Sequence, residues 1–185
     1  MRKDRSLAPY LQERDMKLTD ICPLETWEAL EQELFEKFNF QGSVFTPDGV
    51  RISSVKNFSN RLCPAIKAAE KGQTFICSAA HMNMTALVKN SRKPLVEECD
   101  AGLTKLMVPI FHGDAFLGVA GGCGLVAPEG EVDTFAVSKL AEMAETQVVD
   151  LARTVPRVSG DTIAAVIDLI EKRIRRILDA CHQEA

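Results

Sequence analysis

The hydrophobic pattern predicts a helix and then a β-hairpin in the first third of the chain. One apolar stripe recurs at steps of three or four residues after Pro23, and it consists of Trp27, Leu30, Leu34 and Phe38. This spacing is that of one helix face, which we expect to cover a sheet. Two short strands are predicted at 43–45 and 50–52, on either side of the sequence Pro47-Asp48-Gly49. Because Pro presets a turn and Gly accepts a positive φ, these strands are predicted to pair.

The middle of the chain alternates short helical patterns with strand-like runs. Two helical patterns separated by Gly72 cover 64–71 and 77–89. Strand-like runs follow at 95–96, 103–111 and 115–122, and a longer helical pattern covers 132–151 and ends before Pro156. This order is typical of a small α+β domain with an antiparallel sheet and flanking helices, as in PAS and GAF sensors. We therefore predict a PAS/GAF-like fold with a C-terminal helix.

The last segment carries a row of apolar residues at alternating steps of four and three. The row consists of Ile163, Ile167, Ile170, Ile174, Ile177 and Cys181. Such a row forms either the seam of a homodimer or the face that a helix lays on its own domain. We divide the chain into an N-terminal extension (1–20), a main α+β domain (21–155) and a C-terminal dimer or signalling helix (156–185).

Composition and charge limit the classes of partner. The chain has 185 residues, of which 46% are hydrophobic, and a formal net charge of −4. This acidic balance argues against nucleic acid as a direct partner, because phosphate binding depends on clustered Lys and Arg. The first 15 residues lack the apolar core of a secretory signal, and no apolar run reaches the roughly 20 residues of a membrane span. We expect a cytoplasmic protein without a membrane partner, whose cysteines stay reduced.

Four of the six cysteines lie near the ends of predicted elements, and they are Cys63, Cys77, Cys99 and Cys123. Cys63 opens a predicted helix, where free amides are expected to stabilise a thiolate. Cys123 lies in a glycine-rich run, 121–124, whose missing side chains would let a bulky inorganic group approach the backbone. Four thiolates can hold an iron–sulfur cluster or zinc. Their spacing matches no compact ferredoxin or zinc-finger motif, so buried thiols without a ligand remain an alternative.

His81 and Met84 are further candidate ligands near Cys77. His81 lies four residues after Cys77, hence on the same helix face, and Met84 follows about one turn later. Either residue could serve as the second axial ligand of a haem held by a thiolate. Cys22 and Cys181 are expected to pack away from this group.

Signatures of enzymes are missing from the sequence. It contains no phosphate-binding loop, no nucleophile elbow and no zinc-protease helix. A nucleophilic Cys123 activated by His81 or His112 is the remaining catalytic alternative. We predict a protein that is not an enzyme.

Several short motifs together resemble the PocR sensory domain over about residues 24–144. They are Asn57-Phe58, Cys63-Pro64, Cys77-Ser78, the run from Pro94 to Leu103 that contains Cys-Asp-Ala-Gly-Leu, Val108-Pro109-Ile110, Leu117-Gly118 and Gly121-Gly122. The resemblance implies a PAS-like sensor in transcription regulation or signalling that senses small molecules such as short diols or hydrocarbons. It also implies a cofactor or metal at the three shared cysteines. Asp100 stands where the family commonly has His, and Cys123 stands where it commonly has Gln.

The fourth cysteine decides our functional prediction. We predict that Cys63, Cys77, Cys99 and Cys123 hold an iron–sulfur cluster of the four-iron, four-sulfur type. A redox, gas or small-molecule signal would then pass through the last helix of a homodimer to a separate kinase or transcription regulator. The alternatives are a haem or zinc sensor and a metal-free small-molecule sensor. The pocket of the metal-free sensor would be lined by Phe75, Met82, Met84 and Met107.

Overall fold

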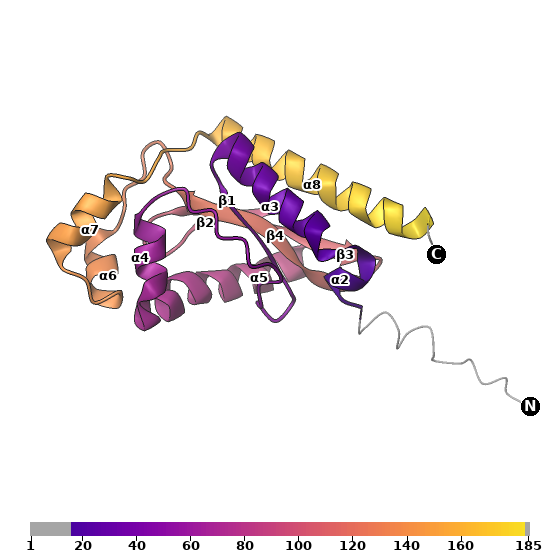
Figure 1. The fold of residues 1–185 in the computed structure, drawn as a ribbon, viewed down its shortest axis with the longest axis horizontal. Helices are drawn as coiled ribbons and strands as arrows, with labels where there is room; N and C mark the ends of the chain where they lie inside the picture. Colours follow the sequence, from indigo (N-terminus) through magenta and orange to yellow (C-terminus); the bar gives the residue numbers. More distant parts are fainter. Residues whose placement is uncertain (1–15, 184–185) are drawn as a thin grey trace, which may run out of the picture.

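The strand-like runs of the sequence assemble into one four-stranded antiparallel sheet of order β1-β4-β3-β2 (Figure 1). The structure, a computed structural model, describes residues 16–183, with side chains described as far as residue 180. The strands are β1 (Gln41–Phe45), β2 (Leu95–Glu98), β3 (Thr104–His112) and β4 (Ala115–Leu125). The helices are α2 (Leu18–Ile21), α3 (Leu24–Phe38), α4 (Leu62–Ala68), the π-helix η1 (Gly72–Ser78), α5 (Ala79–Ser91), α6 (Thr134–Leu140), α7 (Glu145–Ala152) and α8 (Gly160–Gln183). The predicted α+β fold is confirmed.

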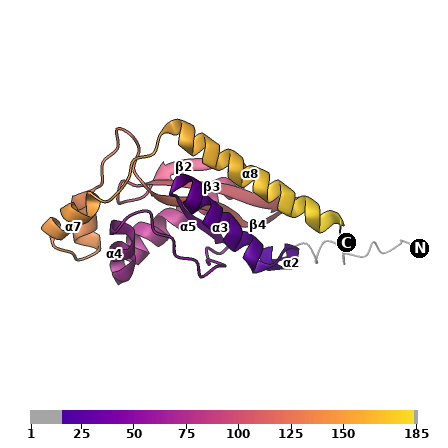
Figure 2. The same ribbon diagram turned by 45° about the horizontal axis from the view of Figure 1, so that its top comes forward.

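Helices cover both faces of the sheet (Figures 1 and 2). Helices α3 and α8 lie on one face, where Leu106, Val108 and Ile110 of β3 point into the main core. Helix α5 lies on the opposite face, where Met107 of β3 and Val119 of β4 pack in a smaller cluster. The two faces alternate residue by residue along β3, because successive side chains of a strand point to opposite sides.

Two predicted elements differ in the structure. Residues 50–52 form no strand, and only a single bridge joins Arg51 to Phe45. β1 pairs along its length with β4 instead. The helical pattern over 132–151 is divided into α6 and α7, because the backbone of Glu142 is left-handed with φ 54° and cannot continue a helix.

The apolar row of α8 packs inside the chain. Val166, Ile170 and Ile174 are buried in the main core, and Ile163 and Ile177 pack against it. The helix therefore lies on its own domain, as one of the two interpretations proposed. A homodimer stays a prediction, and its interface would have to be formed by other residues. The side chain of Cys181 lies outside the described residues. None of the helices within residues 16–183 is both long and apolar enough to cross a membrane.

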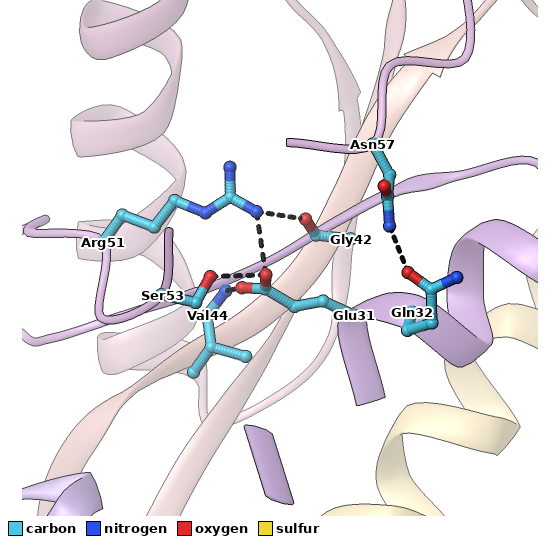
Figure 3. Close-up of polar contacts among 7 residues, drawn as sticks. All are labelled: Glu31, Gln32, Gly42, Val44, Arg51, Ser53 and Asn57. Carbon is cyan, nitrogen blue, oxygen red and sulfur yellow. Dashed lines mark hydrogen bonds and ion pairs between the residues drawn. The ribbon is translucent and has the colours of Figure 1, made fainter. Parts of the chain in front are cut away.

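A buried carboxylate joins α3 to β1 and to the segment that follows it (Figure 3). The side chain of Glu31 is fully buried, and its Oε1 accepts a hydrogen bond from the Val44 amide at 2.8 Å. Its Oε2 accepts from the Arg51 guanidinium at 2.8 Å and from the Ser53 hydroxyl at 2.5 Å. The same Arg51 nitrogen donates to the Gly42 carbonyl at 2.8 Å. This network fixes Arg51 against the free edge of β1.

Substitution of Glu31 should lower the free energy of unfolding, because it disrupts this network. Glu31→Gln keeps the shape but leaves the Arg51 charge without its counter-ion, and we expect a loss of about 2–4 kcal/mol of unfolding free energy. Glu142→Gln is the matched control, because its ion pair with Lys71 is exposed, and it should cost less than about 1 kcal/mol. Urea denaturation of both variants measures the difference. Equal losses would contradict the role given to Glu31.

Substitution of Ile170 tests the packing of α8. Ile170→Ala opens a cavity in the main core, and we expect a loss of about 2–5 kcal/mol that does not depend on protein concentration. Ile177→Ala, at a partly buried position of the same helix, should cost less. Thermal melts over a hundredfold range of concentration provide the measurement. A loss that changes with dilution would show that the row is an interface between two copies.

Candidate functional site

Four cysteines from four separate segments line one cavity. The cavity has a volume of about 340 Å³ and is lined by residues of the sheet and of α4, η1 and α5. Its thiols come from α4 (Cys63), η1 (Cys77), the turn after β2 (Cys99) and β4 (Cys123). Its described lining contains Arg51, Lys67 and Lys105 but no Asp or Glu. The long sequence gaps between the cysteines are therefore bridged by the fold.

Asn60 links the first of these cysteines to the sheet. Its Oδ1 accepts a hydrogen bond from the Cys63 amide at 2.7 Å, which is the bonding pattern of a helix cap. Its Nδ2 donates to the Gly124 carbonyl at 2.6 Å and to Cys63 Sγ at 3.3 Å. Sequence reasoning missed Asn60. An Asn placed three residues before Cys63, where a helix was predicted to begin, is nevertheless a recognisable capping signal.

A tight turn holds Cys99 at the cavity. The Gly102 amide donates to the Cys99 carbonyl at 2.7 Å, and the Cys99 amide donates to the Leu103 carbonyl at 2.9 Å. The turn requires Gly102, whose φ is 73°. Burial raises the pKa of the Cys99 thiol, while hydrogen bonds from the backbone amides of Ala101 and Leu103 act in the opposite direction. The turn thus supplies donors to the sulfur, although burial has the larger effect on its pKa.

A β-bulge immediately after Cys123 shapes the next part of the wall. Leu125 pairs with Thr104 and Cys123 pairs with Lys105, so Gly124 is the extra residue of β4. Its φ of 102° is one that side-chain-bearing residues rarely adopt. Bulges bend a strand and re-aim its side chains. Here the bulge turns the Gly124 carbonyl toward Asn60.

The glycines beside Cys123 do not leave room for an inorganic group in the way that we expected. A Cβ added to Gly122 would lie 2.8 Å from Cδ1 of Phe40. A Cβ added to Gly124 would lie 3.2 Å from the Ser59 hydroxyl oxygen. These spaces are filled by the protein, so the glycines serve close packing and the bulge.

Burial controls the ionisation of the thiols. It raises the pKa of Cys63, and the neighbouring Cys123 adds to this effect. It also raises the pKa of Cys77 to about 11, although the ammonium of Lys67 acts against it. The expected stabilisation of a Cys63 thiolate by the helix start is therefore outweighed by desolvation. Both thiols are protonated at neutral pH.

His81 is a neutral, buried residue of the cavity wall. Its side chain lines the cavity, and its ring centroid lies 3.8 Å from that of Phe45. Burial, and next the charge of Lys105, lower its pKa to about 3. Its Nε2 lies 3.4 Å from the Thr85 hydroxyl, whereas its Nδ1 has no partner among the described residues. His81 is therefore available as a ligand or hydrogen-bonding group.

The other candidate lining residues are placed differently. Met84 does not line the cavity and is buried with Met107 in the small cluster under α5. Of the four residues expected to line a metal-free pocket, Met82 lines the cavity, whereas the side chain of Phe75 is 53% exposed. An axial role for Met84 or a lining role for Phe75 therefore has no support in this geometry.

The thiols surround a space and do not converge on a point. Cys63, Cys77, Cys99 and Cys123 are free thiols. Across residues 16–183, no three His, Cys, Asp or Glu side chains are arranged to hold a metal ion as they stand. Cys22 packs against the main core, away from the cavity.

The comparison with known families gives the identity of the domain. The family described as "Sensory domain found in PocR" matches residues 20–182. The chain belongs to this family. The match to the PocR sensory domain extends beyond the resemblance seen at about 24–144 and includes most of α8. No curated protein and no solved structure matches the chain. Membership supports a sensory, ligand-binding role, and the cavity is the candidate site for it.

The raised pKa of Cys77 predicts slow alkylation in the ligand-free PocR domain. At pH 8 we expect iodoacetamide to label Cys77 about 100-fold more slowly in the folded than in the unfolded chain, because two pKa units remove that much thiolate. The folded rate should still rise tenfold per pH unit above pH 9, where the unfolded rate levels off. Because the folded pKa lies above the unfolded value of 9.0, the associated stabilisation is present below pH 9 and is lost as the pH rises toward 11.

Mass spectrometry of the labelled peptide measures these rates. The same peptide in urea serves as the control for intrinsic reactivity. A folded rate that levels off near pH 9 would show that limited access, and not the pKa, slows the reaction.

Proposed function

We propose that this PocR sensory domain holds an iron–sulfur cluster through Cys63, Cys77, Cys99 and Cys123 and reports its state to a separate protein. The observation that supports the proposal is that all four of these cysteines line one cavity. In a four-iron, four-sulfur cluster each iron takes one thiolate, so its ligands surround a space. The bound cluster would supply one-electron redox chemistry and iron atoms that can react with small gases.

The charges and donors of the cavity support thiolate ligands. Lys67 and Lys105 line the cavity, and both lower the pKa of Cys77 against the larger effect of burial. The amides beside Cys99 and the Asn60 amide group point hydrogen bonds at sulfur. Metal binding displaces the thiol protons, so the uptake of iron should strengthen as the pH rises.

A short backbone path leads from the cavity to α8. Cys123 lies three residues before Val126, whose amide donates to the Pro156 carbonyl at 3.0 Å. The Val126 carbonyl in turn accepts from the Val158 amide at 2.8 Å. Arg157 strengthens this connection by donating to the carbonyl oxygens of Ala127, Pro128 and Gly130. We infer that a displacement at Cys123 reaches the start of α8 along this path.

The output of the domain is then a partner that reads α8. The outer face of this helix is polar, with exposed Asp168, Lys172 and Arg175, and such a face suits a regulated contact with a kinase or a transcription regulator. A shift of the helix between two positions transmits a signal only if the signalling ligand or the change of redox state stabilises one position more than the other. A homodimer is compatible with this scheme, and sensing without catalysis remains part of the proposal.

A metal-free small-molecule sensor is the second candidate. The observation that favours it is a set of buried polar atoms without partners in the cavity wall, Gln41 Oε1, Arg51 Nε and His81 Nδ1. Zinc ranks below the cluster, because its tetrahedral sites draw all four sulfurs to about 2.3 Å from one ion. Haem would use only one of the four thiols, with His81 as its remaining candidate second ligand, because Met84 lies outside the cavity.

Anaerobic reconstitution tests the cluster. We expect brown protein that contains iron and acid-labile sulfide and bleaches in air. Serine substitution at Cys63, Cys77, Cys99 or Cys123 should lower the iron content, whereas Cys22→Ser, in the main core, should not. Circular dichroism of each variant separates ligand loss from unfolding. Colourless protein after reconstitution, or equal loss in Cys22→Ser, would contradict the proposal.

A further inference from the structure

A row of three side chains crosses the cavity face of the sheet. Gln41 of β1, Cys123 of β4 and Lys105 of β3 are register partners, so they lie side by side on the same face. All three line the cavity. No described carboxylate forms an ion pair with Lys105, and Glu97, its register partner on β2, is exposed and outside the lining. Lys105 thus lines the cavity as a cation without an ion pair among the described residues.

Three buried polar atoms around this row also lack partners. They are Oε1 of Gln41, Nδ1 of His81 and Nε of Arg51. The residues Gln41 and His81 are only 1% and 4% exposed, and Arg51 lines the same cavity. Buried polar groups in folded proteins are nearly always hydrogen-bonded, so three unpaired ones in one cavity point to a ligand that completes them.

Hydrogen bonds fix the orientation of Arg51 and leave one of its donors for such a ligand. One terminal nitrogen is fixed by Glu31 Oε2 and by the Gly42 carbonyl, each at 2.8 Å (Figure 3). The planar guanidinium therefore has a set orientation, and its Nε–H remains as a donor. Donors of this kind favour carboxylates, which accept charge-assisted hydrogen bonds.

The two lysines of the cavity differ in their position. Both lower the pKa of Cys77, Lys67 more strongly, and Lys105 also acts on Cys99 and His81. Lys105 lies on the sheet in the row with Gln41, whereas Lys67 lies on α4. This position in the sheet assigns Lys105, together with Arg51, to a bound carboxylate.

We propose that the Gln41, Arg51, His81 and Lys105 side of the cavity binds a small organic hydroxycarboxylate. The carboxylate accepts from Arg51 Nε and the Lys105 ammonium, and the hydroxyl donates to Gln41 Oε1. The short carbon chain lies against Phe45 and Met82, which also line the cavity. This subsite stands beside the proposed cluster and does not require it.

Calorimetric titration with defined probes tests the subsite. The full chain is titrated with L-lactate, glycolate and glycerate, and with 1,2-propanediol as the uncharged counterpart of lactate, both with and without reconstituted iron. We expect at least one hydroxycarboxylate to bind in both forms, and lactate to bind at least about tenfold more tightly than the diol. No binding by any of the three acids, or equal binding of the diol, would overturn the proposal.

Two lysine variants localise the charge. Lys105→Met should weaken acid binding about tenfold or more, whereas Lys67→Met, on α4 and outside the row of the sheet, should change it less than about twofold. Thermal melting of both variants without ligand verifies that they fold. Equal effects of the two variants would overturn the assignment to Lys105. Iron analysis of the same samples reports separately on the cluster, so failure of one proposal is not mistaken for failure of the other.

Discussion

The alternation of side chains along β1, β4 and β3 is the constraint on which the rest of the molecule depends. A strand sends successive residues to opposite faces, so each strand must serve two environments at once. On β3, Leu106 and Val108 seal the core under α3 and α8, and the intervening sequence positions place Lys105 and Met107 on the opposite side. The apolar half of each strand supplies the stability that lets the other half carry thiols, an amide and an ammonium in the wall of the cavity.

Local periodicity was enough to predict the elements whose partners are near in sequence. The stripe of α3 and the β3–β4 hairpin follow from steps of three to four and of two residues. The pairing of β1 with β4, and not with 50–52, depends on distant residues and could not be read locally. The break at Glu142 requires a left-handed backbone that no turn residue announces.

The candidate site was partly predictable for similar reasons. Cysteine is scarce, so four thiols near element ends were visible in the sequence, and the fold brings them to one cavity. Phe75 was misplaced because it lies between the two predicted helical patterns, where no periodicity indicated which way it points; in η1 its side chain is 53% exposed. Gln41, Asn60 and Lys105 were missed because polar residues are common. Only their burial and their neighbours distinguish them from residues in contact with water.

The long-range pairing of β1 also governs the order in which the strands can pair during folding. Residues 46–114 separate β1 from β4, while β3 and β4 are joined by two residues. Closing a long loop costs chain entropy before any contact offsets it, so the β3–β4 hairpin can form early and β1 must dock late. Gln41 and the Arg51 anchor arrive with β1. By this argument, the wall of the cavity that carries Gln41 and Arg51 is the last to close as the chain folds.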